Sequence, residues 1–437
     1  MRRRALLLHP WIADYAAYDF WIQPLGLLWV ASFLRQRGWE PILIDALDGA
    51  RRRPRWDGTA RLRSVSIPDP PAVRASGAHL PRPYRRYGIS PAQLRRRLAA
   101  VGEPAALLVS SQMTYWYPGL RQSVSLAREL WPGIPALLGG GYAALSTEHA
   151  RTTPGIDAVL PSRDLGVSLT LLSRHLAVAP PTAAEVADLA AAWDLAPPAP
   201  HAALVTSWGC PFRCSYCATP TTHGAWRPRP APAILRELRC IARDPAHRHI
   251  ALYDDALLHH ARDHFLEWTG TALSAGYGRE RFVWHLPNAV HARWLDRRVA
   301  ARLGRLGVET LWLGVERLDE AFHRATGGKF AAPDLDRALC ALEAESVRPR
   351  VLGAYLLAGL PKTPDGPLPR SIEGIRRRGL RVAIASFSPV PGTRAFAEAQ
   401  ARESRLALDP IWQNNSLREL RAPQHFAALR ALARDGG

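Results

Sequence analysis

Short apolar runs alternate with amphipathic segments along the first 165 residues. Runs at 4–8, 41–44, 105–110, 135–138 and 157–160 predict strands, and the apolar spacing at 24–36 and about 118–130 predicts helices. This alternation is typical of βαβ units on a parallel sheet. The pattern predicts an α/β domain built on a Rossmann-like open parallel sheet.

A second alternation begins near residue 201. Strands are predicted near 202–207, 249–253, 281–285, 309–314, 351–357 and 381–387, with helical segments between them, for instance at 231–243 and 333–345. Six βα units in this length fit a partial (β/α)6, TIM-like barrel better than a full eightfold one. The Ala- and Pro-rich composition of 176–200 is typical of a linker. The predicted domains are therefore 1–165, a linker at 166–200, a barrel at 201–395 and a C-terminal extension at 396–437.

Composition places the chain among globular proteins, with 47% hydrophobic and 22% charged residues in 437. The longest apolar run, 24–34, is too short to span a bilayer. His9, Pro10 and Asp14 interrupt any apolar core of a signal peptide. We therefore expect a cytoplasmic protein without membrane partners.

The formal net charge of +19 comes almost entirely from arginine, because Lys329 and Lys362 are the only lysines. Residues 51–97 hold thirteen arginines against two aspartates. We predict a solvated, irregular insertion there; the alternative is a patch that meets an anionic ligand or partner. A compositional arginine bias makes nucleic acid an unlikely partner.

Three of the five cysteines lie within eight residues, as Cys210, Cys214 and Cys217 in a CxxxCxxC pattern directly after a predicted strand. Structural zinc needs four ligands, usually in two pairs, whereas thiolates in this number suit an iron–sulfur cluster with one iron left open. Cys240 and Cys340 lie in predicted helices beside apolar residues, so we expect buried thiols there.

With Tyr216 before the last cysteine, this motif resembles the signature of the radical S-adenosylmethionine (SAM) superfamily. The resemblance implies a 4Fe–4S cluster on the three cysteines and SAM on the open iron. It also implies reductive cleavage to a 5′-deoxyadenosyl radical that abstracts hydrogen from a small-molecule or natural-product substrate. An electron donor such as flavodoxin or ferredoxin would then be required.

The same resemblance implies SAM-binding residues at the ends of later strands. Asp254 and Asp255 stand where the family often has Gly-Gly-Glu, Asp255 in the better register, although a helix cap is the alternative. The remaining SAM-binding residues that the resemblance implies are Tyr216, Asn288, Glu316 and Gly359.

The first 165 residues resemble the cobalamin-binding domain found ahead of the barrel in one branch of that superfamily. The resemblance rests on Asp45 and on strand ends at Ser110-Ser111 and Gly139-Gly140-Gly141, which it assigns to cobalamin. A tight turn alone would also explain the glycines. The chain has His9-Pro10-Trp11-Ile12-Ala13-Asp14 in place of an Asp-x-His-x-x-Gly motif, so no histidine is expected to ligate cobalt.

Together these resemblances imply a cobalamin-dependent radical SAM enzyme that transfers a methyl group to an unactivated carbon. Two alternatives stay open: a cobalamin-dependent rearrangement or cyclisation without methyl transfer, and a non-catalytic metal-cluster module that binds nucleic acid through the insertion. The open iron favours an enzyme, because a binding module has no need of one.

Overall fold

The computed structural model describes residues 3–48, 62–77, 80–196 and 199–434. These residues divide into two compact units. The first holds the described residues before 197 together with Ser404–Asn414, and the second holds 199–403 together with the residues from Asn415 onward. Both units are built on parallel sheets, so the predicted α/β class is confirmed.

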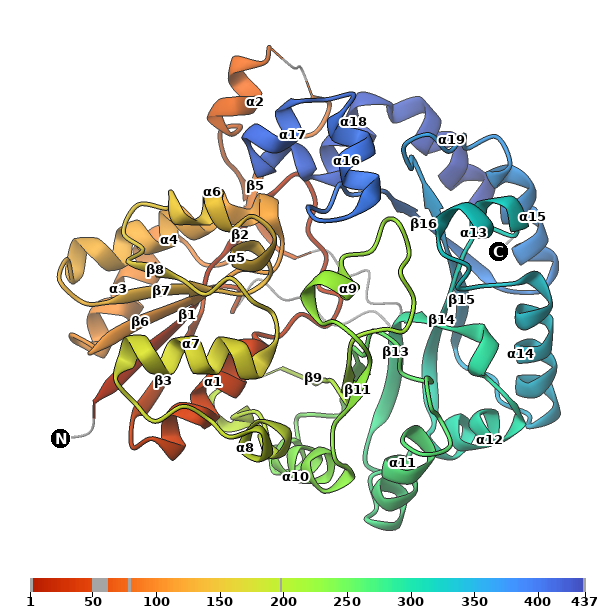
Figure 1. The fold of residues 1–437 in the computed structure, drawn as a ribbon, viewed down its shortest axis with the longest axis horizontal. Coiled ribbons are helices and arrows are strands. Elements are labelled where there is room, and N and C mark those ends of the chain that lie inside the picture. The colour runs from red at the N-terminus through yellow and green to blue at the C-terminus, as the bar shows by residue number, and fades with distance from the viewer. Residues whose placement is uncertain (1–2, 49–61, 78–79, 197–198, 435–437) are drawn as a thin grey trace. The chain divides into compact units, whose positions relative to one another are not determined.

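The first unit contains a sheet of five parallel strands in the order β3-β1-β6-β7-β8 (Figure 1). These are β1 Arg4–His9, β3 Glu40–Asp45, β6 Ala106–Ser110, β7 Ala136–Gly139 and β8 Ala158–Val159. Each lies within two residues of an apolar run in the sequence. The central strands are fully buried because helices cover both faces, which explains their continuous apolar character.

Helices α1 and α7 pack together on one face of this sheet, and α3 and α4 pack together on the other (Figure 1). The helical elements here are α1 Leu25–Gln36, α3 Pro91–Val101, η1 Thr114–Trp116, α4 Tyr117–Leu130, α5 Gly141–Leu145, α6 Thr147–Arg151, α7 Leu165–Leu176, α8 Ala183–Asp188 and η2 Trp193–Leu195. Leu27, Leu28, Ala31 and Leu34 form the buried stripe of α1, with the spacing of an amphipathic helix.

The strand order reverses between β1 and β6. From β1 the chain adds β3 on one side, and it later adds β6, β7 and β8 on the other. In open α/β sheets, ligands bind outside the carboxyl ends of the strands at such a reversal. The loops that begin at His9 and Ser110 therefore border the expected binding position of this unit.

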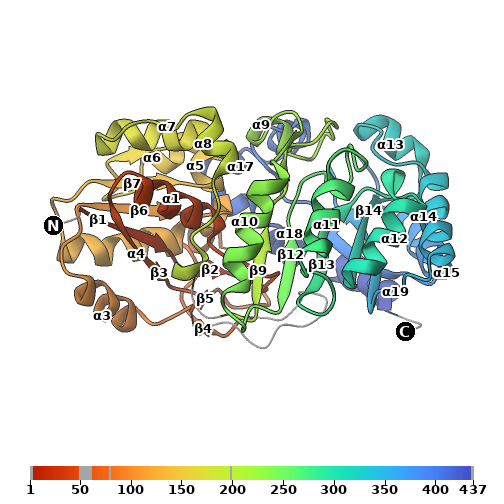
Figure 2. The ribbon, with the colours of Figure 1, turned by 90° about the horizontal axis from the view of Figure 1, so that it is seen from below.

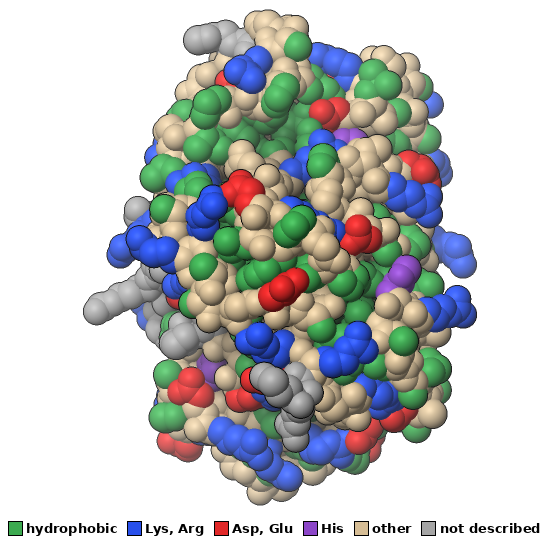
Figure 3. All heavy atoms as spheres, turned by 90° about the vertical axis from the view of Figure 1, so that its left-hand side faces the viewer, with side chains coloured by type: hydrophobic (Ala, Val, Ile, Leu, Met, Phe, Trp, Pro, Cys, Tyr) green, Lys and Arg blue, Asp and Glu red, His purple; other side chains and the backbone are tan. Residues whose placement is uncertain are grey.

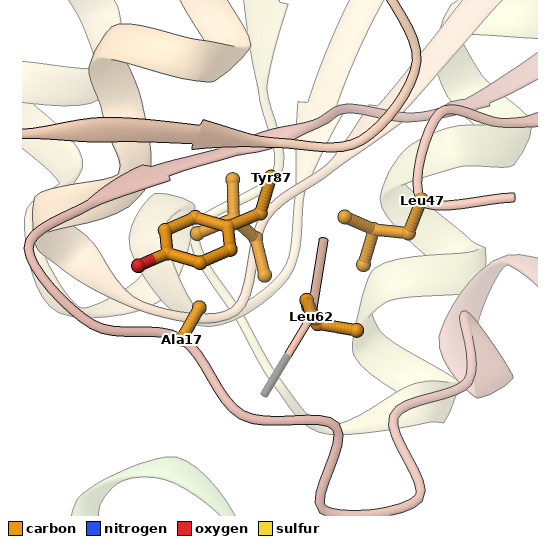
Figure 4. Close-up of a cluster of buried hydrophobic side chains, with 5 residues drawn as sticks. Ala17, Leu47, Leu62 and Tyr87 are labelled. Atoms are coloured by element: carbon orange, nitrogen blue, oxygen red, sulfur yellow. The ribbon is translucent and has the colours of Figure 1, made fainter. Parts of the chain in front are cut away.

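The arginine-rich insertion is more ordered than expected. Its described part contains β4 Ser64–Ser66, α2 Pro71–Ala75 and β5 Arg85–Tyr87, and β5 pairs with both β4 and β2 Ile12–Asp14. Figure 4 shows Tyr87 packed with Ala17, Leu47 and Leu62 in a buried cluster. The prediction of an irregular insertion is wrong for the described part, because it forms two strands and a helix and buries Leu62, Val73, Tyr84 and Tyr87. Most of its other described residues are exposed or half-buried, as predicted. Residues 51–61 and 78–79 lie outside the described residues.

The predicted linker at 166–200 is wrong over most of its length. Helix α7 is part of the first unit, and Trp193 is 3% exposed. The Ala192 amide donates to the carbonyl of Leu28 (3.1 Å), and Arg35 forms two hydrogen bonds with Asp194 (2.8 and 2.6 Å). The segment therefore folds back along α1 through contacts that its Ala- and Pro-rich composition does not show.

The predicted C-terminal extension is divided between the two units. Helices α17 Arg405–Leu408 and η4 Pro410–Gln413 belong to the first unit. There the Asn414 amide donates to Asp14 (2.8 Å), and the Tyr117 hydroxyl donates to Asp409 (2.9 Å). A segment from the end of the chain thus completes the first unit.

The second unit is built on six parallel strands that follow one another in chain order across the sheet (Figure 2). They are β9 His201–Leu204, β12 His249–Leu252, β13 Val283–Val290, β14 Val308–Glu316, β15 Val351–Ala358 and β16 Arg381–Ser386. β9 and β16 do not pair, so the sheet stays open. All six predicted strands are present.

Helices cover the outer side of this sheet (Figure 2). The helical elements of the unit are α9 Thr219–Thr222, α10 Ala231–Ala242, α11 Phe265–Ser274, η3 Ala292–Trp294, α12 Arg297–Leu306, α13 Glu320–Thr326, α14 Ala332–Ala344, α15 Leu368–Arg377, α16 Arg394–Gln400, α18 Asn415–Arg421 and α19 Pro423–Arg434. Both α18 and α19 pack against β16, so the end of the chain covers one edge of the open sheet.

Basic side chains are scattered among apolar and acidic ones on the face of the molecule drawn in Figure 3, without a single basic patch there. No helix among the described residues is long and apolar enough to cross a bilayer.

The buried position of Asp14 predicts that the stability of the protein depends on pH. It is fully buried, and burial raises its pKa from 3.8 to about 6 although Asn414, Trp116 and two backbone amides donate to it. The folded protein therefore binds this proton more tightly than the unfolded chain does. The resulting stabilisation is complete below pH 4 and is lost as the pH rises through 6, a change of up to about 3 kcal/mol.

Thermal unfolding between pH 4 and pH 7 measures this effect. We expect Asp14→Asn to lose part of the decline in melting temperature that the wild type shows over this range. The exposed Asp48, paired with Arg97, provides the control, and Asp48→Asn should follow the wild type. Parallel profiles for the wild type and Asp14→Asn would show that Asp14 does not titrate in this range.

Candidate functional site

The three clustered cysteines lie in the loop that follows the first strand of the barrel. After β9 the chain forms β10 Ser207–Trp208, which pairs with β11 Arg227–Pro228, and the loop from Cys210 to Cys217 lies between them. All three thiols are half-buried and reduced. The loop therefore stands at the carboxyl end of the sheet, where barrel enzymes hold their reactive groups.

Two glycines allow the close packing of this loop. Gly209 has φ +80°, and a Cβ there would lie 2.3 Å from the carbonyl oxygen of Ala225. Gly327 has φ +128°, and a Cβ there would lie 2.9 Å from the Cα of Cys214. A side chain at either position would displace the backbone that carries the thiols.

Asp255 binds the same loop from the end of β12. Its Oδ2 accepts hydrogen bonds from the Gly209 amide (2.9 Å) and from Nδ1 of His223 (2.7 Å), and its Oδ1 accepts from the Thr219 hydroxyl (3.2 Å). These contacts lie on both sides of the cysteines in the sequence. Asp255 is thus a positioning residue for the loop, and it is still 19% exposed through its side chain.

Asp254 is buried, and its side chain is turned toward Thr206 and Ser207, which follow β9. Its Oδ1 accepts from the amide and hydroxyl of Thr206 (3.0 and 2.7 Å) and from the Ser207 hydroxyl (2.7 Å). Burial raises the pKa of Asp254 to about 6 despite these bonds. The Asn288 amide donates to the carbonyl of Asp254 (2.7 Å), so Asn288 supports the same turn. Of the two aspartates, Asp255 is the one placed beside the cysteine loop.

A buried ion pair lies beside the cysteines. Glu316, at the end of β14 with φ +63°, accepts a hydrogen bond from Nζ of Lys329 (2.5 Å). The Lys329 ammonium also lies 5.9 Å from the centre of the Tyr216 ring. Burial lowers the pKa of Lys329, but Glu316 and the thiols of Cys214 and Cys217 outweigh it, so the pKa is raised and the side chain is cationic.

Lys329 is the residue that the sequence motifs did not reveal. It is one of only two lysines in the chain, which is the single signal that could have drawn attention to it. At this position the compact ammonium group is buried and donates to Glu316, whereas the other lysine, Lys362, is exposed.

Gly359 lies in a loop that Asp365 closes. Its amide donates to both carboxylate oxygens of Asp365 (3.1 and 2.9 Å), which also accept from the buried Arg317 (2.6 Å) and from His425 of α19 (2.9 Å). With φ +77° the position requires glycine. The loop is thus held by a charged network at the end of β15.

The donor set of the cysteine loop fits an iron–sulfur cluster. Burial raises the pKa of the Cys210 thiol to about 11 and that of Cys214 as well, the latter opposed in part by Lys329, so metal binding would have to displace protons. No three His, Cys, Asp or Glu side chains in the described ranges converge on one metal ion. A four-iron cluster differs, because each thiolate binds a separate iron atom.

Cys240 and Cys340 lie outside this loop, on α10 and α14. Cys240 is half-buried and Cys340 is exposed, so the prediction that both thiols are buried is wrong. On α14 the buried face is formed by Leu335, Ala338 and Leu342, and Cys340 lies to one side of it. The apolar residues that neighbour Cys340 in the sequence did not show whether its side chain lies on the buried or the exposed face of α14.

In the first unit, the serines and glycines assigned to cobalamin lie at neighbouring strand ends. Ser110 pairs with Gly139 across β6 and β7, and the Tyr142 amide donates to the carbonyl of Ser111 (3.1 Å). A Cβ on Gly140 would lie 2.6 Å from Oγ of Ser110, and one on Gly141 would lie 2.1 Å from the carbonyl oxygen of Gln112. Packing of the two loops thus explains Gly140 and Gly141, whereas Gly139 faces open space.

His9 lies at the end of β1, on the other side of the strand-order reversal. Its Nδ1 is 2.8 Å from Oδ1 of Asp45, which ends β3, and the same oxygen accepts from the Leu47 amide (2.9 Å). The side chain of His9 is 13% exposed. The imidazole is therefore held by a carboxylate at the edge of the sheet.

The barrel unit is similar in sequence to known proteins. Residues 204–373 match the family model of the radical SAM superfamily. Over 192 residues the chain is 27% identical to the ribosomal protein uS12 methylthiotransferase RimO of Roseiflexus sp. (strain RS-1). The match covers 38% of this chain and 40% of that relative, so the chain spans less than half of its length.

Two solved structures share the fold across both units. The radical S-adenosylmethionine methyltransferase TsrM from Kitasatospora setae, with cobalamin and a 4Fe–4S cluster bound, matches 92% of this chain and 75% of its own, with a TM-score of 0.64 and 11% identity. TsrM with tryptophan substrate and the SAM analogue aza-SAM bound matches with a TM-score of 0.63 and 13% identity, over 92% of this chain and 76% of that one. The likeness establishes the fold.

The cysteine loop generates a prediction about iron. Anaerobically reconstituted protein should hold about four irons per chain, and Cys214→Ala should lose them, because three thiolates are the ligands that this loop offers. Cys240→Ser and Cys340→Ser are the matched controls and should keep the wild-type iron content. Iron and sulfide analysis with the visible absorption spectrum measures both. If Cys240→Ser lost the cluster, the three-cysteine assignment would be wrong.

Proposed function

The chain contains a radical SAM domain, and we propose that it is a cobalamin-dependent radical SAM enzyme that transfers a methyl group to an unactivated carbon of a small-molecule substrate. The observation that carries the proposal is a fold match that spans 92% of the chain, including both the sheet unit and the barrel unit.

The cysteine loop supports the first part of this proposal. Cys210, Cys214 and Cys217 would hold the cluster, and Asp255 fixes the backbone that carries them. When bound, the cluster supplies the electron that cleaves SAM, and cobalamin supplies the methyl group. The protein contributes binding, orientation and exclusion of water.

Glu316 and Lys329 are suited to the amino-acid end of SAM, which carries one ammonium and one carboxylate. The pair is buried and has both charges within 2.5 Å of each other, so a zwitterion could bind by exchanging partners without leaving a net charge uncompensated. Asp255 offers a second carboxylate beside the loop. Tyr216 stacks on Phe322 with the ring centres 6.4 Å apart, and its ring lies 5.9 Å from the Lys329 ammonium.

Cobalamin would bind at the carboxyl edge of the five-stranded sheet. The strand order reverses between β1 and β6, where ligands of such sheets bind, and Ser110, Ser111 and Gly139 lie at this edge. We infer that His9 does not ligate cobalt, because the segment after β1 lacks the Asp-x-His-x-x-Gly motif; the Asp45 contact alone would be compatible with ligation through the other ring nitrogen.

The described part of the arginine-rich insertion gives no support to the nucleic-acid module. Its described part packs into the first unit, with Tyr84 and Tyr87 buried, and Arg85 donates to Ser64 (2.8 Å) within the small sheet. Rearrangement without methyl transfer remains the competing enzyme reaction, and the fate of the methyl group distinguishes the two.

Methyl transfer is tested with SAM labelled in its methyl group. Protein reconstituted with iron, sulfide and cobalamin, and given dithionite, should cleave one SAM to 5′-deoxyadenosine and labelled methionine, and should convert a second SAM to S-adenosylhomocysteine as its label passes to bound cobalamin. Cys214→Ala with cobalamin bound is the control for the cluster-dependent cleavage. Labelled methionine forms in either reaction; 5′-deoxyadenosine without labelled cobalamin and without S-adenosylhomocysteine would support the rearrangement. Failure to retain cobalamin would exclude both cobalamin reactions.

Asp255 generates a separate prediction about SAM affinity. Asp255→Asn should weaken SAM binding by about 1–3 kcal/mol, or roughly 5- to 150-fold in Kd, the usual loss when a charged hydrogen-bond partner is removed. Asp263→Asn, an exposed carboxylate in the loop after the same strand, is the matched control and should bind as the wild type does. Isothermal titration with the reconstituted protein measures both.

The iron content of Asp255→Asn distinguishes a direct contact of Asp255 with SAM from its role in positioning the cysteine loop. Weaker SAM binding at full iron content would support a direct contact with SAM. Unchanged affinity would leave Asp255 as a positioning residue for the cysteine loop alone.

A further inference from the structure

A single carboxylate joins three separate parts of the barrel unit. Asp365 lies in the loop after β15, and its side chain is 10% exposed. Its oxygens accept from the Gly359 amide of the same loop (3.1 and 2.9 Å), from the guanidinium of Arg317 (2.6 Å) and from Nε2 of His425 (2.9 Å). Arg317 directly follows β14, and His425 lies on α19. Both oxygens of Asp365 are therefore engaged within the unit.

Arg317 is held at both its side chain and its backbone. The guanidinium donates to the carbonyl of Pro364 (2.6 Å) as well as to Asp365, and the Arg317 carbonyl lies 2.7 Å from Nε2 of His323. The side chain is 1% exposed. Loss of one partner from a buried ion pair leaves an uncompensated charge, which is costly. Asp365 therefore determines where Arg317 lies.

The residue before Arg317 has a strained backbone. Glu316 has φ +63°, and the Arg317 amide donates to the carbonyl of Val315 (2.8 Å), which closes a tight turn around Glu316. Such a conformation persists only where the surrounding structure holds it. In this turn Glu316 accepts the hydrogen bond from Lys329 (2.5 Å). Arg317, and through it Asp365, thus keeps the Glu316 carboxylate in place.

The last helix of the chain lies against the loop after β15. Besides the hydrogen bond of His425 to Asp365, the ring of Phe426 is 3.4 Å from where a Cβ on Gly359 would lie, and Phe426 is buried. Helix α19 itself packs on α15 and β16 (Figure 1). Two neighbouring residues of α19 therefore support the loop that begins at Gly359.

We propose that His425 is a positioning residue for SAM, acting through Asp365 on the loops that end β14 and β15. The inference rests on the proposed function, which assigns Glu316 and Lys329 to the amino-acid end of SAM. His425 holds one oxygen of the carboxylate on which the positions of Arg317 and of the Gly359 loop depend. Helix α19 thus sets the affinity for SAM and not the rate at which bound SAM is cleaved.

His425 is suited to a test because its side chain is 46% exposed, so its replacement should leave the protein folded. His425→Ala should raise the Kd of SAM about 2- to 10-fold, the range for loss of one hydrogen bond. His425→Gln, whose side-chain amide donates in place of Nε2, should stay within about twofold of the wild type. Isothermal titration of the iron-reconstituted variants measures both.

Kinetics distinguish positioning from a general loss of structure. With dithionite as reductant, His425→Ala should have a raised KM for SAM, while the rate of 5′-deoxyadenosine formation at saturating SAM and the iron content remain those of the wild type. The matched control is Gln424→Ala, an exposed neighbour on the same helix, which should keep the wild-type KM.

Replacement of the central carboxylate should have a larger effect. Asp365→Asn should raise the Kd of SAM at least about tenfold, because the buried Arg317 loses its charged partner. Asp336→Asn is its control: this carboxylate accepts two hydrogen bonds from Arg378 (2.6 and 3.1 Å), away from both loops, and its loss should leave the affinity unchanged.

Hydrogen exchange provides a readout without SAM. The Gly359 amide donates to Asp365, so its exchange with deuterium should be faster in His425→Ala than in the wild type, and unchanged in Gln424→Ala. Mass spectrometry of peptides that contain Gly359 measures this rate.

Equal SAM affinity in His425→Ala and the wild type would overturn the positioning role, as would a loss of iron in that variant. Failure of the proposed function has a different outcome. The wild-type protein would then neither bind nor cleave SAM, while the exchange of the Gly359 amide would still respond to His425→Ala.

Discussion

The hydrogen bond from the Gly209 amide to Asp255 is the interaction on which the candidate site most depends. It joins the loop after the first barrel strand to the end of the second. Three reactive thiols in eight residues would otherwise be carried by backbone with little regular structure. Asp255 also binds Thr219 and His223 on the far side of the loop, so one carboxylate determines where the loop leaves the sheet and where it returns.

The protonation of the thiols in this loop depends on a buried cation and its partner carboxylate. Cys210 and Cys214 are in surroundings that favour the neutral thiol, and the cation of Lys329 opposes that effect at Cys214. Glu316 in turn holds Lys329. A buried ion pair is costly unless both partners are well satisfied, and here each charge has the other as its partner.

The sequence predicted the order of elements well, because buried parallel strands are continuous apolar runs and amphipathic helices have a clear period. It also predicted the residues at the strand ends. It could not predict which neighbour each of these side chains binds. Asp254 and Asp255 are adjacent in the chain, yet one is turned toward Thr206, between β9 and β10, and the other toward the cysteine loop. Lys329 reaches the site from a loop beyond α13, and no local motif marks it.

Predictions made from composition were wrong where contacts between distant parts of the chain determine the structure. The Ala- and Pro-rich segment near Trp193 is typical of a linker, but α1 supplies partners for it. The arginine-rich insertion buries Tyr84 and Tyr87 in the first unit. Asn414 reaches Asp14 from 400 residues away along the chain. Contacts of this separation have no local pattern in the sequence.

The central claim is that three cysteines hold a four-iron cluster and leave one iron open to SAM. Mössbauer spectroscopy of protein reconstituted with iron-57 tests it directly, with and without SAM. We expect one of the four iron sites to change its isomer shift when SAM binds, while the other three keep the values of thiolate-bound iron. Four sites that do not respond to SAM would contradict the account, because they would show a closed cluster with a fourth ligand from the protein.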